Sequence, residues 1–353
     1  MALAELSLQD LRCIQAAELS FQPGSNLLYG ANGAGKTSVL EAVFLLGRGR
    51  SFRTRLNEKL IRHGQPQLRV VGRSQSGPLQ HTLGVEVARD GGTRARLDAQ
   101  SVRSLADLAT AFPVQVLDPD AHRLIEDSAT RRRRWLDWAV FHVEPGFAAT
   151  WARYSRALQQ RNAALRSGQG DLRIWDRELI QDGERLSAAR ERVLGCLQPY
   201  WEDVSQTLLD EGLTLGFQAG WDRDLGLAEA LAGAGSRDRL RKTTTVGPHR
   251  ADVAIRIRGK PVREVLSRGQ QKLAAVALTL CQLEFLKQEH QVLPTLLLDD
   301  PSAELDRGRL DRFIDRVKAL QTQLIVTALD RDFGLFGTPD AVFHVEHGRV
   351  TPG

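Results

Sequence analysis

Hydrophobic and polar residues alternate loosely over residues 3–20, and this pattern predicts two short strands with a turn near residue 12. A short apolar segment at residues 26–29 follows and leads into a glycine, as expected for a buried strand that ends in a turn. Residues 38–46 read Ser-Val-Leu-Glu-Ala-Val-Phe-Leu-Leu, which has helical character. The amino-terminal part of the chain therefore predicts strands followed by a glycine-rich loop and a helix.

Alternation returns over residues 68–97, where an Asp-Gly-Gly sequence at 90–92 predicts a turn between antiparallel strands. The composition changes near residue 120. From Arg131 to about Leu197 the chain is rich in Ala, Leu, Arg and Glu, and apolar residues recur at every seventh position, at Leu179, Leu186 and Val193. The Ser-Gly-Gln-Gly sequence at 167–170 interrupts this region, which predicts a helical hairpin.

Small residues at 232–236 (Ala-Gly-Ala-Gly-Ser) predict a flexible loop. Strand patterns follow at residues 251–257, 295–298 and 323–326. At 353 residues the chain exceeds one average domain. We expect an α/β fold in which residues 1–120 and 246–353 form one discontinuous domain with a sheet core, and residues 121–245 form a helical insertion.

Composition narrows the class of protein only slightly. Hydrophobic residues make up 42% and charged residues 26%, as in an ordinary globular protein, and the net charge of +5 is compatible with nucleic acid without requiring it. Three cysteines, far apart and without a CxxC pair, argue against a zinc site or a disulfide framework and favour a reducing compartment. The first residues lack the pattern of a signal peptide, and no stretch approaches the roughly 20 apolar residues that cross a bilayer, so we expect a cytoplasmic protein without membrane contact.

Residues 30–37 read Gly-Ala-Asn-Gly-Ala-Gly-Lys-Thr, a full match to the phosphate-binding pattern G-x-x-x-x-G-K-[ST]. The glycines allow backbone N–H groups to surround phosphates, Lys36 reaches the β- and γ-phosphates, and the Thr37 hydroxyl binds Mg²⁺. An accidental glycine-rich turn is the alternative, and the strand before the loop and the helix after it argue against that. The residues predicted to surround ATP are Gly30, Ala31, Asn32, Gly33, Ala34, Gly35, Lys36, Thr37 and Ser38.

The apolar strand predicted at residues 295–298 ends in Asp299 and Asp300. An acidic strand end is common in isolation. Beside a phosphate loop, the first carboxylate holds Mg²⁺ and the next acidic residue polarises the attacking water. We therefore predict that Lys36, Asp299 and Asp300 carry out ATP hydrolysis, with Mg²⁺ bound by Thr37 and Asp299.

A third motif, Leu266-Ser267-Arg268-Gly269-Gln270, precedes the acidic strand. By itself it predicts a helix N-cap at Ser267. Between the two nucleotide motifs it resembles the LSGGQ signature of ABC ATPases. That resemblance implies that Ser267, Arg268, Gly269 and Gln270 complete the ATP site of a second subunit, and that residues 302–306, with Asp306, form the D-loop of the dimer interface.

Four further stretches make the resemblance more specific. They are Leu11-Arg12, the Gly-Arg-Gly-Arg-Ser-Phe-Arg sequence at 47–53, the Arg-Arg-Arg-Arg-Trp-Leu-Asp sequence at 131–137 and the Gly-Pro-His-Arg-Ala-Asp sequence at 247–252. In content and order these motifs resemble the RecF family of bacterial recombination-repair ATPases, whose heads are of the ABC/SMC type. The resemblance covers essentially the whole chain, and it implies that Arg12 contacts the nucleotide.

The resemblance also implies a function. A RecF-like protein would dimerise on ATP, clamp DNA at gaps or junctions of single and double strands, and assist RecA loading and the SOS response with RecR and RecO as partners. Asp300 stands where transporters carry Glu, and Thr327 stands near the usual histidine, which implies a slow ATPase. The alternatives are a transporter nucleotide-binding subunit and a structural SMC-like DNA tether, although residues 121–245 are too few for an SMC coiled-coil arm.

Basic residues gather in one segment. Residues 48–73 contain seven arginines and one lysine against a single glutamate. Such a block is either a solvated face or a DNA contact, and its proximity to the ATP loop leaves the two alternatives about equal. The candidate DNA contacts are Arg48, Arg50, Arg53 and Arg55. The alternatives for Arg131–Arg134 are phosphate binding and pairing with acidic neighbours, of which we favour pairing, and we expect His249 to support the fold rather than catalysis.

Overall fold

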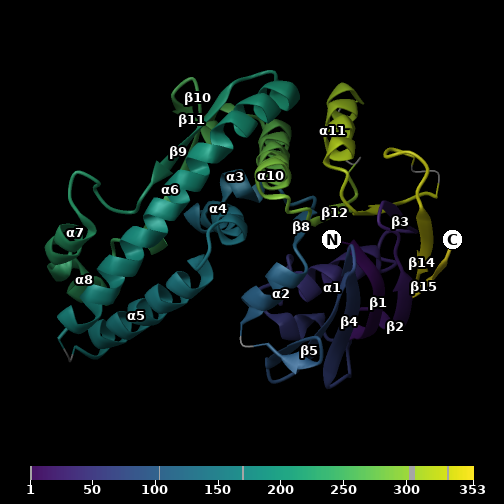
Figure 1. Cartoon of the computed structure of the whole chain (residues 1–353), viewed down its shortest axis with the longest axis horizontal. Coiled ribbons are helices and arrows are strands. Elements are labelled where there is room, and N and C mark those ends of the chain that lie inside the picture. The colour runs from purple at the N-terminus through teal and green to yellow at the C-terminus, as the bar shows by residue number, and fades with distance from the viewer. Residues whose placement is uncertain (1, 103, 169–170, 302–306, 332–333) are drawn as a thin grey trace. The chain divides into compact units, whose positions relative to one another are not determined.

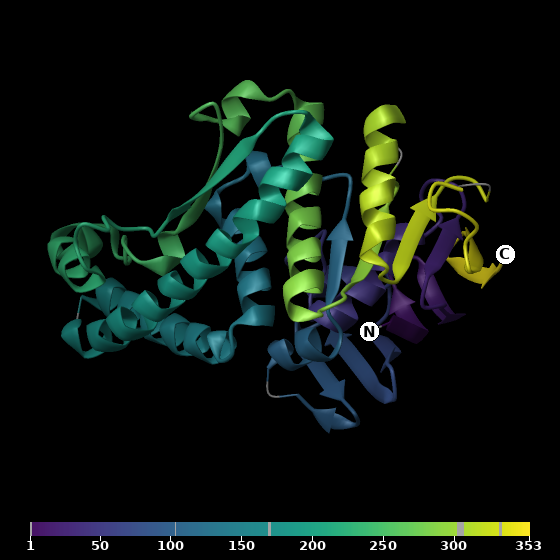
Figure 2. The same cartoon turned by 45° about the horizontal axis from the view of Figure 1, so that its top comes forward.

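The computed structural model describes residues 2–102, 104–168, 171–301, 307–331 and 334–353 (Figures 1 and 2). The chain divides into two compact units. Unit 1 comprises Met1–Ala121 and Gln291–Gly353, and unit 2 comprises His122–His290. Unit 1 contains two six-stranded sheets and unit 2 a three-stranded sheet, and the nucleotide motifs 30–37 and 299–300 both lie in unit 1.

Unit 1 contains a six-stranded sheet with the order β2-β1-β4-β5-β6-β7, in which every neighbouring pair is antiparallel. This sheet confirms the strands and turns predicted from alternation. Its strands are β1 (Ala2–Leu11), β2 (Ile14–Ser20), β4 (Gln67–Ser76), β5 (Leu79–Ala88), β6 (Thr93–Leu97) and β7 (Gln100–Ser101).

The second sheet of unit 1 has the order β15-β14-β3-β13-β12-β8 and is parallel except for β15. Its inner strands are continuous apolar runs, as buried parallel strands are. The strands are β3 (Ser25–Tyr29), β8 (Val114–Leu117), β12 (Thr295–Asp299), β13 (Leu324–Ala328), β14 (Ala341–Glu346) and β15 (Arg349–Pro352).

Helix α1 (Lys36–Arg48) contacts strands of both sheets and is buried over most of its length. Its apolar residues share one core with Leu6 of β1, Val70 of β4 and Ile325 of β13. A helix that is apolar on every side has to be covered on every side. The remaining helical segments of unit 1 are η1 (Asn57–Leu60), α2 (Leu105–Ala111) and α11 (Arg307–Leu320).

Unit 2 is built on the predicted helical hairpin, α5 (Phe147–Ser167) and α6 (Arg173–Leu209). The seventh-residue stripe Leu179, Leu186 and Val193 is buried along α6, as expected. Helices α3 (Arg123–Glu126) and α4 (Ala129–Val143) precede the hairpin. The elements after it are β9 (Leu213–Gln218), α7 (Leu227–Gly233), α8 (Gly235–Arg241), η2 (Pro248–Arg250), β10 (Asp252–Ile257), β11 (Lys260–Pro261), α9 (Val262–Val265) and α10 (Arg268–His290).

The prediction of a flexible loop at 232–236 is wrong, because these residues end α7 and begin α8. Alanine favours helix, and Ala234 is buried between the two helices. Asp238 of α8 is also buried and accepts a hydrogen bond from Arg161 of α5 at 2.7 Å, which fixes α8 to the hairpin.

The predicted return to the first domain at residue 246 also differs from the structure, since residues 246–290 belong to compact unit 2. Strand β10 pairs with β9, and α10 packs against α4 and α6. Trp135 Nε1 donates to the carbonyl of Leu278 at 3.2 Å, and Gln282 Nε2 donates to the carbonyl of Trp135 at 2.7 Å. Long-range packing of this kind is not visible in local periodicity. None of the helices in the described ranges is long and apolar enough to span a membrane.

Candidate nucleotide-binding site

Strand order brings the nucleotide motifs to one edge of the parallel sheet. Strands β3, β13 and β12 are neighbours, and Leu28, Thr327 and Asp299 lie in one row across them. Since parallel strands end at the same edge, the loop after β3 and the acidic residues at the end of β12 meet there. This arrangement confirms the strand-loop-helix context that the phosphate-loop motif requires.

The loop at 30–35 needs glycine at two positions for different reasons. Gly30 has φ 148°, and a Cβ atom there would lie 2.1 Å from the carbonyl oxygen of Val345. Gly35 has φ 120° and immediately precedes α1. The loop is held from outside by the N–H of Gly348, which donates to the carbonyl of Ala34 at 2.9 Å. Ala31, Asn32 and Gly33 are exposed, so the outer part of the loop is open to a ligand.

Lys36 is buried at the start of α1. Its Nζ donates to the carbonyl oxygens of Gly30 at 2.5 Å and Ala31 at 3.0 Å. Burial lowers the pKa of the ammonium, and the negative charges of Asp300 and Asp299 oppose that shift. The cation therefore lies beside the loop and the two carboxylates, where a triphosphate would need it.

Thr37 and Asp299 are the most informative pair in the site. The Thr37 hydroxyl donates to Asp299 Oδ1 at 3.0 Å and Oδ2 at 3.1 Å, although the two residues are 262 positions apart. Two neighbouring oxygen ligands of an octahedral Mg²⁺, each at about 2.1 Å, lie about 3 Å apart. The spacing therefore fits two adjacent Mg²⁺ ligands. Among the described residues no group of three or more His, Cys, Asp or Glu side chains forms a metal site, so such an ion would also need oxygens from nucleotide and water.

Burial raises the pKa of Asp299, while hydrogen bonds from Thr327 and Thr37 and the charge of Arg53 lower it. The influence of Arg53 on Asp299 was not predicted from the sequence, in which Arg53 was only a candidate DNA contact. Its Nη1 also lies 3.7 Å from Glu41 Oε2. Arg53 therefore contributes to the electrostatics of the nucleotide site.

Asp300 follows the strand directly and has φ 50°, in the left-handed region that Asp tolerates better than most residues. Its N–H donates to Thr327 Oγ1 at 3.0 Å. This turn directs the chain away from β12 immediately after Asp299. Asp300 directly follows β12 at the same edge of the sheet, and its negative charge raises the pKa of Lys36.

Glu41 is a buried residue beside the site that was not predicted from the sequence. It is fully buried on α1, one turn after Thr37, and accepts two hydrogen bonds of 3.0 Å from the Arg12 guanidinium. Ser51 Oγ donates to it at 2.6 Å. Arg12, predicted to contact the nucleotide, is thus held against α1 by Glu41, and its contact with ATP stays a prediction. The one available signal was an acidic residue inside an otherwise apolar helix.

The signature segment lies in unit 2, where Ser267 caps α10 as expected. The N–H of Gln270 donates to Ser267 Oγ at 3.4 Å, and the N–H of Ser267 donates to Gln270 Oε1 at 2.9 Å. This reciprocal arrangement is a capping box. Ser267, Arg268 and Gly269 are exposed. The predicted D-loop, including Asp306, lies outside the described residues.

The predicted DNA contacts differ from one another in their surroundings. Arg50, Arg53 and Arg55 are exposed, whereas Arg48 is half-buried, with its guanidinium 5.6 Å from the centre of the Phe44 ring. Nothing in this geometry assigns them to DNA, and that role stays a prediction.

Part of the arginine run at 131–134 pairs as expected. Arg131 bonds to Asp127 at 2.5 Å, and Arg132 makes two hydrogen bonds to Asp252 at 2.8 and 3.0 Å. His249, as expected, supports the fold of unit 2. Its ring nitrogens bond to Tyr154 Oη at 2.7 Å and to the carbonyl of Thr244 at 3.0 Å.

Residues 2–349 match the model of the RecF/RecN/SMC N terminal domain family. The chain is 40% identical over 359 residues to the DNA replication and repair protein RecF of Pectobacterium atrosepticum, covering 99% of both chains. It is also 40% identical over 360 residues to the protein of that name from Pseudomonas syringae pv. syringae, covering 99% of this chain and 98% of the relative.

Solved structures agree with the sequence relatives. A structure described as the recombination mediator protein RecF-ATP in the RecFOR pathway superposes with a TM-score of 0.90 at 26% identity, covering 99% of this chain and 97% of the other. An SMC head bound to the C-winged helix domain of ScpA has a TM-score of 0.61 at 15% identity, covering 100% and 98% of the two chains, and shows the shared fold.

The fold and site together define a P-loop ATPase head of the ABC/SMC type. Its phosphate loop and its acidic strand end are the parts that P-loop ATPases use for nucleotide. Within this class, the chain belongs to the RecF family of DNA replication and repair proteins.

Proposed function

We propose that the chain is an ATP-dependent DNA-binding protein of recombinational repair that dimerises on ATP and holds DNA at gaps or at junctions of single and double strands. The observation that carries this proposal is the Thr37–Asp299 pair beside the phosphate loop, together with an exposed signature segment. The first binds nucleotide, and the second is available to another subunit. The solved relatives are described with ATP and in the RecFOR pathway, which supports the same role here.

The chemistry assigned to this chain is slow hydrolysis of ATP to ADP and phosphate. Lys36 neutralises the β- and γ-phosphates, while Thr37 and Asp299 hold Mg²⁺, which supplies charge neutralisation between the phosphates. Asp300 polarises the attacking water. A carboxylate on the short Asp side chain, with Thr327 rather than an imidazole beside it, gives weak activation of that water. Hydrolysis then acts as a timer for the closed state, and DNA accelerates it.

The exposed signature segment supports dimerisation. Arg268 and Gly269, the first residues of α10, are exposed, and a helix N-terminus favours an anion. A γ-phosphate held at Lys36 of one subunit lacks donors on its outer side. The second subunit's Ser267 and adjacent N–H groups supply them, so ATP joins two heads. RecR and RecO are the proposed partners, and RecA loading is the proposed outcome.

The DNA contact is assigned to the arginines at 48, 50, 53 and 55, but with unequal roles. Arg50 and Arg55 are exposed and suit phosphate contact. Arg53 also reaches Glu41 and the field of Asp299, so its replacement would change hydrolysis as well. Changing Arg50 and Arg55 to Ala should lower the slope of log affinity against log salt by about one unit for each lost phosphate contact. An unchanged slope would leave this segment a solvated face.

The test of the function is binding to a labelled gapped duplex, measured by fluorescence anisotropy with Mg-ATP and with Mg-ADP. The proposal expects tighter binding with ATP, and tighter binding to the gapped duplex than to a blunt duplex of the same length. Lys36→Met is the matched control, because it removes the charge facing the phosphates and should make the two nucleotides equivalent. Equal affinity with ATP and ADP would refute an ATP-driven clamp. Equal affinity for gapped and blunt DNA would favour a structural tether.

A further inference from the structure

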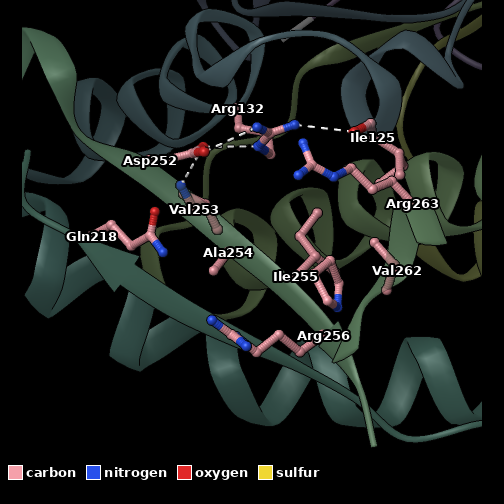
Figure 3. A pocket seen from close by; sticks show the side chains of 11 residues that line it. Ile125, Arg132, Gln218, Asp252, Val253, Ala254, Ile255, Arg256, Val262 and Arg263 are labelled. Atoms are coloured by element: carbon pink, nitrogen blue, oxygen red, sulfur yellow. Dashed lines mark hydrogen bonds and ion pairs between the residues drawn. The ribbon is translucent and has the colours of Figure 1, made fainter. Parts of the chain in front are cut away.

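Unit 2 contains a hollow beside strand β10 that the nucleotide chemistry does not use (Figure 3). Its volume is about 160 Å³. The floor is the stretch from Asp252 to Arg256, and the walls include Ile125 of α3, Arg132 of α4, and Val262 and Arg263 of α9. All of these residues belong to one compact unit, so the hollow is a feature of unit 2 alone.

The hollow lies beside β10 at the point where the neighbouring strand β11 ends. Strands β10 and β11 form a hairpin through Arg258 and Gly259, whose φ values of 49° and 79° are those of a type I′ turn. Strand β11 pairs only with Arg256 and Ile257, through Pro261 and Lys260. The chain then leaves the sheet, because Val262 begins α9.

The register of the β10–β11 pair shows which backbone groups of β10 have no neighbouring strand. In a two-residue hairpin the pair next to the turn, here Ile257 and Lys260, exchanges both hydrogen bonds. Backbone groups alternate along a strand, so the N–H and C=O of Ile255 and Val253 face the same side as those of Ile257. In the described part of the chain only β9 and β11 pair with β10, and β11 ends opposite Arg256.

One of these backbone groups has a hydrogen-bond partner next to it in the sequence, and the others face no neighbouring strand. The N–H of Val253 donates to Oδ1 of its neighbour Asp252 at 2.8 Å. The N–H and C=O of Ile255 and the C=O of Val253 therefore form a short open strand edge along the hollow. An open edge of this kind is a template for another extended chain.

The side chains around the edge specify the charge of such a chain. Ile125 and Val262 supply apolar surface, while three arginines and one aspartate supply charge. Arg132 is bound to Asp252 by two hydrogen bonds, at 2.8 and 3.0 Å. Arg256 is exposed, and the Arg263 side chain is 64% exposed. Figure 3 shows the Arg263 side chain directed toward Arg132, with Arg256 on the other side of β10. Positive charge thus lies on both sides of strand β10, with Arg263 on the side of the open edge.

We propose that this edge binds an extended acidic peptide segment of a partner protein by strand addition. The peptide pairs its backbone with Ile255 and Val253, places an apolar side chain against Ile125 and Val262, and presents carboxylates to Arg256 and Arg263. Backbone pairing with alternate side chains in a pocket is an established mode of peptide recognition. The arginine forks bind carboxylates through charge-assisted hydrogen bonds.

The first test uses a synthetic library of fluorescein-labelled pentapeptides in which Glu or Asp alternates with Val, Ile, Leu or Phe. A matched library carries Lys at the acidic positions. The full-length protein should bind members of the acidic library and none of the basic one. Failure of every acidic peptide to bind, or equal binding of the two libraries, would overturn the proposal.

The second test separates the arginines from general surface charge. Arg256→Glu with Arg263→Glu should weaken binding of the best acidic peptide by about tenfold or more, as expected for loss of charge-assisted hydrogen bonds. The control is Arg177→Glu with Arg239→Glu, the same charge change at two exposed arginines of unit 2 away from the hollow. ATP affinity of both variants reports that they fold. Equal losses of peptide affinity in the two variants would mean that only long-range attraction between the protein and the acidic peptide is at work, and would contradict a site at β10.

The third test concerns the backbone. Amide hydrogen exchange within residues 252–257 should slow when the peptide binds, with the change at Ile255 rather than at the residues already paired to β9. A peptide N-methylated at its central residue, which cannot pair on both sides, should lose affinity. Unchanged affinity of the N-methylated peptide and unchanged exchange would show a simple anion site and rule out strand addition.

Discussion

The Thr327 hydroxyl donates to Asp299 Oδ1 at 2.8 Å, and Thr327 Oγ1 in turn accepts a hydrogen bond from the N–H of Asp300 at 3.0 Å. The strand register produces this arrangement, because Thr327 of β13 lies directly opposite Asp299 of β12. One hydroxyl therefore positions both acidic residues of the site. The sequence indicated only that an imidazole was missing at this position, whereas the structure gives the threonine a role of its own.

Thr327→Val should slow ATP hydrolysis by about tenfold, as loss of a group that orients a metal ligand commonly does. The variant keeps the shape of the side chain but removes both hydrogen bonds, so Asp299 and the Asp300 turn lose their support. ATP binding should change less than turnover. Thr327→Ser retains the hydroxyl and should hydrolyse ATP at nearly the original rate. Hydrolysis by the valine variant at the original rate would remove Thr327 from this role.

The two aspartates should give different defects. Asp300→Asn should bind ATP but hydrolyse it poorly, so that the closed dimer accumulates. Asp299→Asn should weaken the Mg²⁺-dependent part of ATP binding, because it removes a charged ligand beside Thr37. Titrations of ATP with and without Mg²⁺, combined with single-turnover hydrolysis, separate the two effects. Identical hydrolysis in Asp300→Asn and the original protein would exclude Asp300 as the residue that polarises water.

Glu41→Gln should destabilise unit 1, because it leaves the Arg12 guanidinium beside a neutral amide. Breaking a buried ion pair typically lowers the free energy of unfolding by about 3 kcal/mol. Glu86→Gln is the control, since Glu86 bonds to Arg69 and Arg94 near the surface and such pairs contribute about 0–1 kcal/mol. Urea unfolding of both variants gives the comparison. Equal small losses would mean that Glu41 is not a stabilising hub.

His249 predicts a pH dependence of stability. Burial, with Arg250 and Arg133 nearby, lowers its pKa from 6.5 to about 4, although the Thr244 carbonyl and Asp238 favour the charged form. That carbonyl can only accept, so Nε2 carries the proton and Nδ1 accepts from Tyr154. Between these pKa values the unfolded chain binds a proton that the folded chain does not. Stability from this group is therefore complete above pH 6.5 and is lost as the pH falls toward about 4.

The measurement is the free energy of unfolding at a series of pH values through that window. His249→Gln retains a hydrogen-bonding side chain without a titrating ring, so its stability should fall less steeply with acid. Other carboxylates titrate in both proteins and cancel in the difference. Parallel curves for the two proteins would show that His249 is protonated in the folded state as readily as in the unfolded one.

Features that lie in consecutive residues could be predicted from the sequence. The phosphate loop, Asp299-Asp300 and the cap at Ser267 each occupy a short segment whose spacing has a mechanical reason. Contacts between segments far apart in the chain could not be predicted. Tertiary packing brings together Glu41 with Arg12 and Ser51. It also produces the effect of the Arg53 charge on Asp299 and the hydrogen bond from Thr327 to Asp299. The prediction of a loop at 232–236 was wrong because burial of Ala234 outweighed the local glycine signals. The domain boundary predicted at 245 differs from the structure because α10 packs within unit 2.

The central claim is that ATP joins two heads through the signature, and Ser267→Arg tests it directly. The change adds bulk at an exposed site and removes the hydroxyl that accepts the Gln270 N–H. Nucleotide affinity at low protein concentration, where heads are apart, should be nearly unchanged, because Ser267 does not serve its own ATP. Sedimentation velocity at high concentration with Mg-ATP should show a dimer for the original protein and a monomer for the variant. A variant that still dimerises with ATP would contradict the clamp, and so would an original protein that stays monomeric.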